Sequence, residues 1–394
     1  MRNMNILILL CVAVGSVHCL IGKSKTSAVE SDLGMKIFNQ VAMSQPTENI
    51  AMSPHGMVSL LWILQFGADG ITKKELNGVL KYKRLGTHSR LKNVHKSLTK
   101  HKSNDVVTFA NGIFIPRGLV LRKTFIKRCS KTYQTGPTNV DFADSEAAAS
   151  TINKWAEHGT KGMITEIISP DILDETTKLV VANAIYFKGA WKSKFDVTKT
   201  HDEGFTGADG DVSQVPTMVQ TSVFKLGKAS TPNKVEYNVL QLSFFGGLRM
   251  FIILPVDSST PLTEIIPHIN VNSIKAWTKI LKKEKLDISI PRFTAQSKTN
   301  FEELLTPLGF KNIFDKQNAN FRKLSKFSHL YVSQILQEVK IEVNEEGTKA
   351  SKMTAARLLF KSRSTRFAVN RPFLYVIWHQ STETILFIGQ FAKP

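Results

Sequence analysis

The chain has 394 residues, of which 42% are hydrophobic and 21% are charged. This composition excludes a collagen, a coiled coil or a mainly disordered chain, and the length is sufficient for a large core. The formal net charge is +20 at pH 7. Such an excess favours a polyanionic partner, and nucleic acid, sulfated glycan and anionic membrane all remain open at this stage.

The N-terminal residues 1–19 predict a secretory signal peptide. Arg2 precedes an apolar stretch through Val14, and the small residues Val17 and Cys19 flank a possible cleavage site. The stretch is too short to span a membrane. A buried N-terminal helix is the alternative. We therefore expect a secreted, extracellular protein without a membrane span, in which residues 20–394 form one domain.

The sequence predicts neither a disulfide nor N-glycosylation, two features that are common in secreted proteins. Removing residues 1–19 would leave Cys129 as the one remaining cysteine, so we expect no internal disulfide. The sequence has no Asn-x-Ser/Thr motif, so N-glycosylation is not expected.

The first third of the chain predicts helices. Helical spacing of apolar residues follows Ser31, a second helix begins at Ser53-Pro54 and ends near Gly67, and a third covers 87–102. Further helices are expected near 145–167 and 300–308.

The remainder predicts mainly strands, because its apolar or alternating segments are rich in β-branched and aromatic residues. Helices that precede strands, without a linker or a repeat, indicate one α+β domain with large sheets. The expected strands are 106–115, 179–187, 248–254, 286–290, 330–343, 373–378 and 385–388.

The segment 344–366 has neither a helical nor a strand period, although predicted strands flank it. A loop of this length inside a compact domain is usually functional. Its basic residues, which include Lys349, Lys352, Lys361 and Arg363, make it a target for proteases that cleave after lysine or arginine. A tolerated surface loop is the alternative.

Common catalytic motifs are absent. The sequence has no Gly-x-Ser-x-Gly elbow, no His-Glu-x-x-His helix and no phosphate-binding Gly-x-x-x-x-Gly-Lys loop, and its histidines lack the spacing of metal ligands. We expect neither an enzyme nor a metal site. A catalytic triad assembled from distant residues is the open alternative.

Several segments together resemble the serpin family, in the order that the family has. The resemblance covers residues 33–394. Three segments are similar to the nexin-like branch of the family in particular, namely Ser53–Gly56, Phe66–Gly70 and Ile265–Ile269. The family motifs are Asn49–Pro54 at the start of helix B, Asn183–Gly189 with Trp191 and Phe195 in strand 3A, Glu345–Ala350 in the hinge, and Asn370–Phe373 and Phe387–Gln390 in the C-terminal strands.

The resemblance implies the serpin fold, with three β-sheets, eight or nine helices and an exposed reactive centre loop at about 344–366. It also implies an inhibitor that traps a serine protease as an acyl-enzyme by inserting the cleaved loop into the central sheet. The family spacing places the cleaved bond fourteen residues after Gly347, at Lys361-Ser362. Nine residues then separate Lys361 from Arg371, which agrees with the nexin-like pattern.

A lysine at the cleaved bond implies trypsin-like proteases as partners, namely plasmin, plasminogen activators, trypsin or thrombin. Arg363 is a competing cleavage site. The hinge residues implied by the family are Glu345, Glu346, Gly347, Thr348 and Ala350.

In an inserted strand, alternate side chains face the protein body. Lys352 departs from the family at one of these positions, and burying its ammonium group costs a few kcal/mol unless the stem reaches water. We therefore expect inhibition with some cleavage that produces no complex. The inward positions are Thr348, Ala350, Lys352, Thr354, Ala356 and Leu358.

Two further sites follow from the family pattern. The breach consists of Trp191, Arg292 and Glu345, where opposite charges could hold the hinge closed. A solvated ion pair of little energetic value is the alternative. The shutter consists of Ser53, Asn183 and Gln337. The family often has histidine at the position of Gln337, and nexin-like members share the glutamine.

By the family resemblance, the third helix corresponds to helix D, the heparin site of glycan-regulated serpins. Its lysines at positions 92, 96 and 100 recur every four residues on one face. Heparin or heparan sulfate is preferred over nucleic acid because aromatic residues do not alternate with the cations. A solvated helix face is the alternative, and the cluster Lys279, Lys282, Lys283 and Lys285 is interpreted as ordinary surface. The expected heparin-binding residues are Arg90, Lys92, His95, Lys96, Lys100 and Lys102.

The expected function is therefore that of a secreted, heparin-responsive serine protease inhibitor. It would act as a monomer and need no cofactor. The main rival is a non-inhibitory serpin that is cleaved as a substrate and acts as a binding or carrier protein.

Overall fold

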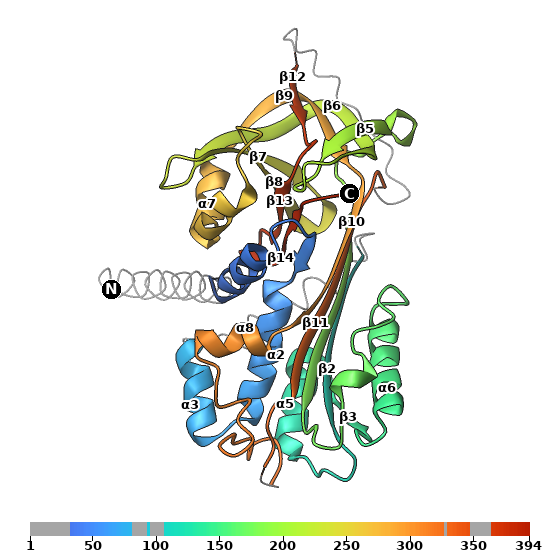
Figure 1. Cartoon of the computed structure of the whole chain (residues 1–394), viewed down its shortest axis with the longest axis vertical. Coiled ribbons are helices and arrows are strands. Elements are labelled where there is room, and N and C mark those ends of the chain that lie inside the picture. The colour runs from blue at the N-terminus through green and yellow to red at the C-terminus, as the bar shows by residue number, and fades with distance from the viewer. Residues whose placement is uncertain (1–31, 81–92, 95–105, 327–328, 347–363) are drawn as a thin grey trace, which may run out of the picture.

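The computed structural model describes residues 32–80, 93–94, 106–326, 329–346 and 364–394. Two β-sheets dominate it (Figure 1). A nine-stranded sheet with α7 occupies the upper half of the view, and a five-stranded sheet runs lengthwise through the lower half. This arrangement confirms the α+β class expected from the sequence.

The five-stranded sheet has the order β10-β11-β4-β2-β3. Its central strands β11 and β4 run parallel, whereas β10 is antiparallel to β11 and β2 is antiparallel to β4. All but the last residue of β4 are buried, so this strand is covered on both faces. The bounds are β2 Val106–Pro116, β3 Pro137–Val140, β4 Val180–Lys188, β10 Phe293–Asn300 and β11 Gln334–Val343.

The nine-stranded sheet has the order β1-β14-β13-β8-β7-β6-β9-β12, with β5 paired to β6. Strand β6 is 19 residues long and pairs with β5 near its start and with β7 near its end. This continuous strand joins two of the three sheets expected from the family into one hydrogen-bonded sheet. The bounds are β1 Ile50–Met52, β5 His201–Thr206, β6 Val212–Ser230, β7 Glu236–Ser243, β8 Leu248–Pro255, β9 Lys282–Pro291, β12 Thr365–Ala368, β13 Phe373–His379 and β14 Thr384–Phe391.

Helices cover both faces of the five-stranded sheet. Helix α6 packs on one face, where Ile152 and Ala156 are buried with Val180 and Ala182 of β4. Helix α2 contacts β4, β11 and β14 from the other side (Figure 1). The bounds are 32–44 for the first helix, α2 Pro54–Gly67, α3 Gly70–Val79, α5 Lys123–Tyr133, α6 Ser145–Gly159, α7 Val271–Ile280 and α8 Glu302–Leu305.

Every residue of α2 is buried. Its start is fixed by Ser53, whose hydroxyl accepts a hydrogen bond from the Gly56 amide, and by Pro54 at the first helical position. No helix of the described residues is long and apolar enough to cross a membrane. The described residues also contain no cluster of acidic, cysteine or histidine side chains that could hold a metal ion.

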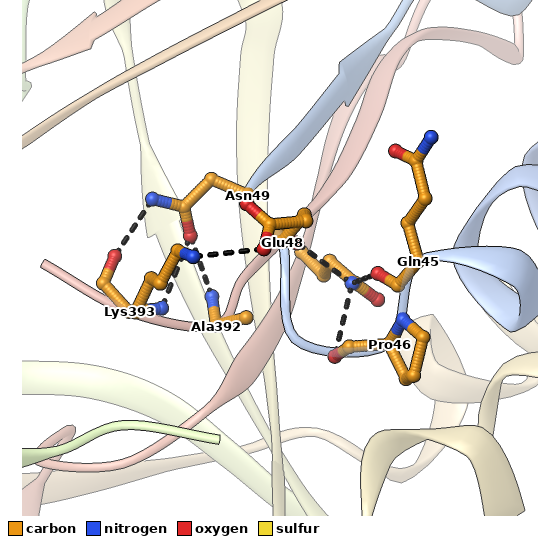
Figure 2. Close-up of polar contacts among 7 residues, drawn as sticks. Gln45, Pro46, Glu48, Asn49, Ala392 and Lys393 are labelled. Carbon is orange, nitrogen blue, oxygen red and sulfur yellow. Dashed lines mark hydrogen bonds and ion pairs between the residues drawn. The ribbon is translucent and has the colours of Figure 1, made fainter. Parts of the chain in front are cut away.

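The segment before β1 is joined to the C-terminal strand by side-chain hydrogen bonds (Figure 2). The Asn49 amide donates to the Lys393 carbonyl at 2.7 Å and accepts from the amides of Ala392 and Lys393 at 2.7 and 3.2 Å. The Gln390 amide donates to the Glu48 carbonyl at 2.8 Å. These contacts support the pairing of β1 with β14 immediately before α2.

Several expected elements have different bounds. The helix near 145–167 ends at Gly159, because the Thr160 hydroxyl accepts from the Ile164 amide and Gly162 has a φ of +82°. The isoleucines that extended the apolar pattern are buried in the following loop. The strand expected from 330 begins only at Gln334, and the helix at 300–308 is α8 followed by a short 3-10 turn.

The other expected strands lie within one to four residues of the observed ones. In the helix expected over 87–102 only 93–94 are described; both are helical, and Val94 is buried.

Candidate functional site

The parallel contact between β4 and β11, called the seam below, is the central feature of the five-stranded sheet. Its register runs from Val180 opposite Gln334 to Lys188 opposite Glu342. The seam lies between two antiparallel pairs, and β11 ends at Val343, directly before the 344–364 connection to β12. The expected reactive loop therefore begins where the seam ends.

The three shutter residues meet across the seam and are fully buried. Gln337 and Asn183 lie directly opposite each other on β11 and β4, and the Gln337 amide nitrogen donates to the Asn183 side-chain oxygen at 2.9 Å. Gln337 also accepts from the Ser53 amide at 2.9 Å and donates to the Ser53 carbonyl at 3.1 Å. Separating the two strands would break the first of these bonds.

The network continues into the neighbouring strand and into α2. Asn183 donates to the Ala110 carbonyl and to the Asn111 side-chain oxygen of β2, both at 3.0 Å. The Ser53 hydroxyl donates to the Leu386 carbonyl of β14 at 2.7 Å. One buried chain of hydrogen bonds therefore links β2, β4, β11, β14 and the start of α2.

Gly56 makes this network possible because it brings α2 very close to the seam. A Cβ atom at Gly56 would lie 2.1 Å from the Asn183 side-chain oxygen and 2.7 Å from the Gln337 amide nitrogen. Both distances are far below van der Waals contact, so no larger residue fits without displacing the two amides. Its role was not predicted from the sequence, although Gly56 lies inside a family motif.

At the upper end of the seam, the breach residue Trp191 holds the first residue after β11. Its indole nitrogen donates to the Asn344 carbonyl at 2.7 Å. The ring is buried and stacks on Phe244, with ring centroids 4.1 Å apart. This packing fixes the indole, so the hydrogen bond holds the start of the connection against the body of the protein.

The other two breach residues are close but only weakly coupled. Arg292 and Glu345 approach to 3.8 Å, and the Arg292 side chain is 49% exposed. Solvent screening makes such a pair worth little. Glu345 is 5% exposed and accepts a hydrogen bond from the Thr200 hydroxyl at 2.7 Å. The partly buried, shorter bond to Thr200 therefore contributes more to the position of Glu345 than the pair with Arg292 does.

The next hinge residue, Glu346, is exposed and forms an ion pair with Lys188 at 3.1 Å. Lys188 is the last residue of β4, so this pair crosses the top of the seam. Neither Thr200 nor Lys188 was predicted, because contacts between residues so far apart in the chain leave no local signal in the sequence.

On the face of the sheet covered by α6, β11 carries the buried carboxyl group of Glu338. The Gln296 amide donates to one of its oxygens at 2.8 Å, while the other oxygen has no hydrogen-bond partner in the described part of the chain. Burial raises the pKa of Glu338, and the nearby Lys298 opposes this shift. The sequence does contain a sign of this buried carboxyl group, because Gln337 and Glu338 are two successive polar residues within an apolar strand.

Many of the expected site residues lie outside the described ranges. These include the signal segment 1–19, the bond Lys361-Ser362, the competing site Arg363, and the inward-facing positions with Lys352. They also include the hinge residues Gly347, Thr348 and Ala350, and the heparin row Arg90, Lys92, His95, Lys96, Lys100 and Lys102.

The arrangement has clear relatives among known proteins. The sequence profile of the family described as Serpin (serine protease inhibitor) matches residues 28–394. Glia-derived nexin of Rattus norvegicus is 41% identical over 389 residues, which cover 98% of each chain. Plasminogen activator inhibitor 1 of Neovison vison is 34% identical over 375 residues, which cover 94% of each chain.

A solved structure agrees with both sequence comparisons. The crystal structure of native protease nexin-1 with heparin superposes with a TM-score of 0.88 and 40% sequence identity, covering 94% of this chain and all of that chain. The family and the nexin-like branch inferred from the sequence motifs are thereby confirmed. The chain belongs to the serpin family of serine protease inhibitors.

Proposed function

We propose that this chain is a secreted, monomeric inhibitor that traps trypsin-like serine proteases after they cleave Lys361-Ser362. The observation that carries the proposal is the closed seam. A parallel pair of strands lies between antiparallel neighbours, and the proposed reactive loop continues directly from one of the two central strands. Glia-derived nexin and plasminogen activator inhibitor 1 are similar along nearly their full length.

The topology of the seam suits insertion of a strand in one direction only. A segment that reverses after Val343 runs antiparallel to β11, and because β4 is parallel to β11 it also runs antiparallel to β4. Inserting it would make the sheet antiparallel from β10 to β2. Antiparallel pairing is slightly more stable per residue than the parallel pairing that it replaces.

The chemical step is acyl transfer. The hydroxyl oxygen of the protease serine attacks the carbonyl carbon of Lys361, and the bond from this carbon to the Ser362 nitrogen breaks. The Ser362 amine leaves with a proton, and Lys361 remains as an ester on the protease. Cleavage frees the segment before Lys361 to insert, while the protease is still attached.

The hydrogen-bond balance favours insertion. Opening the seam breaks one ladder of backbone hydrogen bonds, between β4 and β11. The inserted strand then forms two ladders, one with each of these strands, so the net gain is one ladder. About fourteen residues at about 1 kcal/mol each give a gain of about 14 kcal/mol. Burying Lys352 subtracts a few kcal/mol, about a fifth of this gain. Insertion therefore remains downhill but slower, and some protease escapes by hydrolysing the ester.

The decisive experiment incubates the full chain with trypsin, plasmin, a plasminogen activator and thrombin. We expect a complex that survives denaturing electrophoresis, which Lys361→Ala abolishes and the matched Arg363→Ala preserves. Lys352→Ala should lower the amount of inhibitor consumed per protease trapped. If only cleaved chain accumulates with every protease, the non-inhibitory carrier function replaces the proposal.

A separate measurement tests whether the intact chain stores free energy that loop insertion releases. Chain cleaved in the loop should unfold at a higher temperature than intact chain, because insertion adds a strand to the sheet. Equal unfolding temperatures would contradict the insertion mechanism even if cleavage occurs at Lys361.

We also propose that heparin or heparan sulfate accelerates inhibition through the row Lys92, Lys96 and Lys100. The related protease nexin-1 has been crystallised with heparin. Charge reversal at the three lysines should lower the salt concentration needed for elution from heparin, because fewer counterions are released on binding. The matched control reverses the exposed Lys279, Lys282 and Lys311. Equal losses in both variants would contradict this site.

A further inference from the structure

A cleft of about 840 Å³ lies next to both ends of the 344–364 connection. Trp191, which binds the Asn344 carbonyl, lines it on one side. Thr365, the first residue of β12, lines it on another. Any protein that binds the connection therefore comes within reach of this cleft.

The cleft is strongly cationic. Four lysines line it, and Glu284 is its one carboxylate. Lys225 and Lys283 lie directly opposite each other on β6 and β9, an arrangement of like charges that destabilises a sheet. Within the described part of the chain, none of the four lysines has an ion-pair partner. The four are Lys192, Lys225, Lys283 and Lys285.

The cleft also has an apolar part. Val223 is 36% exposed and lies opposite Lys285, whereas Trp191 and Leu242, which also line the cleft, are almost fully buried and form its floor. Protein interfaces combine an apolar centre with a charged rim. A sulfated glycan would use the lysines but gain little from the apolar residues, so the lining favours a protein partner.

We infer that this cationic cleft, defined by Lys192, Lys225, Lys283 and Lys285, is a docking surface for a carboxylate-rich surface of the target protease. The inference rests on the proposed function, because that function brings a protease to the connection. Complementary charge steers the encounter and mainly raises the association rate. Among proteases that cleave after lysine, the chain would therefore prefer those that are acidic near their active site.

The test compares two doubly substituted full-length chains. The cleft variant carries Lys283→Glu and Lys285→Glu. The control carries Lys279→Glu and Lys282→Glu, which are exposed, adjacent in the chain and outside the cleft lining, and which change the net charge equally. In the cleft variant, Lys283→Glu also turns the repulsive pair with Lys225 into an attractive one, so a folding defect is not expected.

The probes are anionic and cationic trypsin, which share a specificity for lysine and arginine but differ in net charge. With anionic trypsin, the cleft variant should form covalent complex about tenfold more slowly than the control, and the difference should shrink at about 0.5 M NaCl. With cationic trypsin, the same variant should react faster than the control. Equal rates for both variants with both trypsins would overturn the inference.

A second measurement separates this inference from the proposed function. Anionic trypsin whose catalytic serine is replaced by alanine binds without acylation, and its Kd should be about tenfold weaker for the cleft variant than for the control. Loss of binding here, without any covalent complex from the unsubstituted chain, would support the cleft and overturn the inhibitor function. If covalent complex forms but the two variants have equal rates and equal Kd values, the inhibitor function is supported and the docking cleft is overturned. If the cleft variant loses only affinity for heparin, the cleft is a glycan site and the inference is wrong.

Discussion

The close approach of α2 to the seam at Gly56 provides a test of the shutter. Gly56→Ala would place a methyl carbon 2.1 Å from the Asn183 side-chain oxygen and 2.7 Å from the Gln337 amide nitrogen. These two atoms share a hydrogen bond of 2.9 Å. The methyl group and this bond are therefore mutually exclusive unless the helix moves away from the sheet.

The expected loss of stability follows from this geometry. Breaking the bond leaves a donor on Gln337 and an acceptor on Asn183 buried without partners, at about 1–3 kcal/mol each. Alanine in a helix recovers about 0.5–1 kcal/mol relative to glycine. The free energy of unfolding should therefore fall by about 1–5 kcal/mol.

The matched control is Gly78→Ala in α3, where a Cβ would meet no atom within 4 Å. This variant should gain the helix preference without a clash and become more stable by about 0.5–1 kcal/mol. Guanidinium unfolding followed by tryptophan fluorescence, with the unfolding rate measured alongside, would compare the two variants. If Gly56→Ala is as stable as Gly78→Ala, the shutter is looser than its distances indicate and the reasoning fails.

Three further predictions concern single side chains. Because burial raises the pKa of Glu338 in the folded chain, the free energy of unfolding should fall as pH rises from its unfolded pKa through its folded pKa. Glu338→Gln should flatten this part of the profile and be more stable at neutral pH; a profile parallel to the parent's would refute the prediction. Asn49→Ala removes three hydrogen bonds to the C-terminal residues and should cost about 1.5–4 kcal/mol in denaturant unfolding. The control Lys393→Ala, which loses only an exposed ion pair, should cost less than about 1 kcal/mol. Burial raises the pKa of Cys129 to about 12, so in chain without residues 1–19 its thiol should react with a thiol reagent only at the rate of unfolding, and a fast reaction of that native chain would contradict its position.

The sequence predicted best the strands in which nearly all residues are buried. Strands β4, β13 and β14 are buried on both faces, and each appears as a mainly apolar run. Strand β6 was missed, and β9 was predicted too short. The burial of β6 changes along its length, and β9 begins with the exposed charges of Lys282 to Glu284, so neither presents a clean period of two.

The candidate site was predictable only through family motifs. Asn183 and Gln337 are ordinary polar residues in apolar strands, and nothing in a single sequence places them opposite each other. Thr200 is a hydrogen-bond partner of Glu345, yet the two lie 145 positions apart in the chain. The contact joins the residue before β5 to the second residue after β11, and local patterns do not encode such a pairing.

The contacts across the seam are unequal along its length, which bears on how it opens. At its middle, Gln337 and Asn183 belong to a buried network that is anchored to α2 and to two neighbouring strands. At its upper end, two contacts join the β4 side to the β11 side: the partly exposed pair of Lys188 and Glu346, and the hydrogen bond from the Trp191 indole to the Asn344 carbonyl. Water can replace the exposed ion pair at little cost, but it cannot replace the buried bonds of the shutter. A strand entering from the 344 end therefore has to displace the Trp191 bond first and the larger buried network of the shutter afterwards.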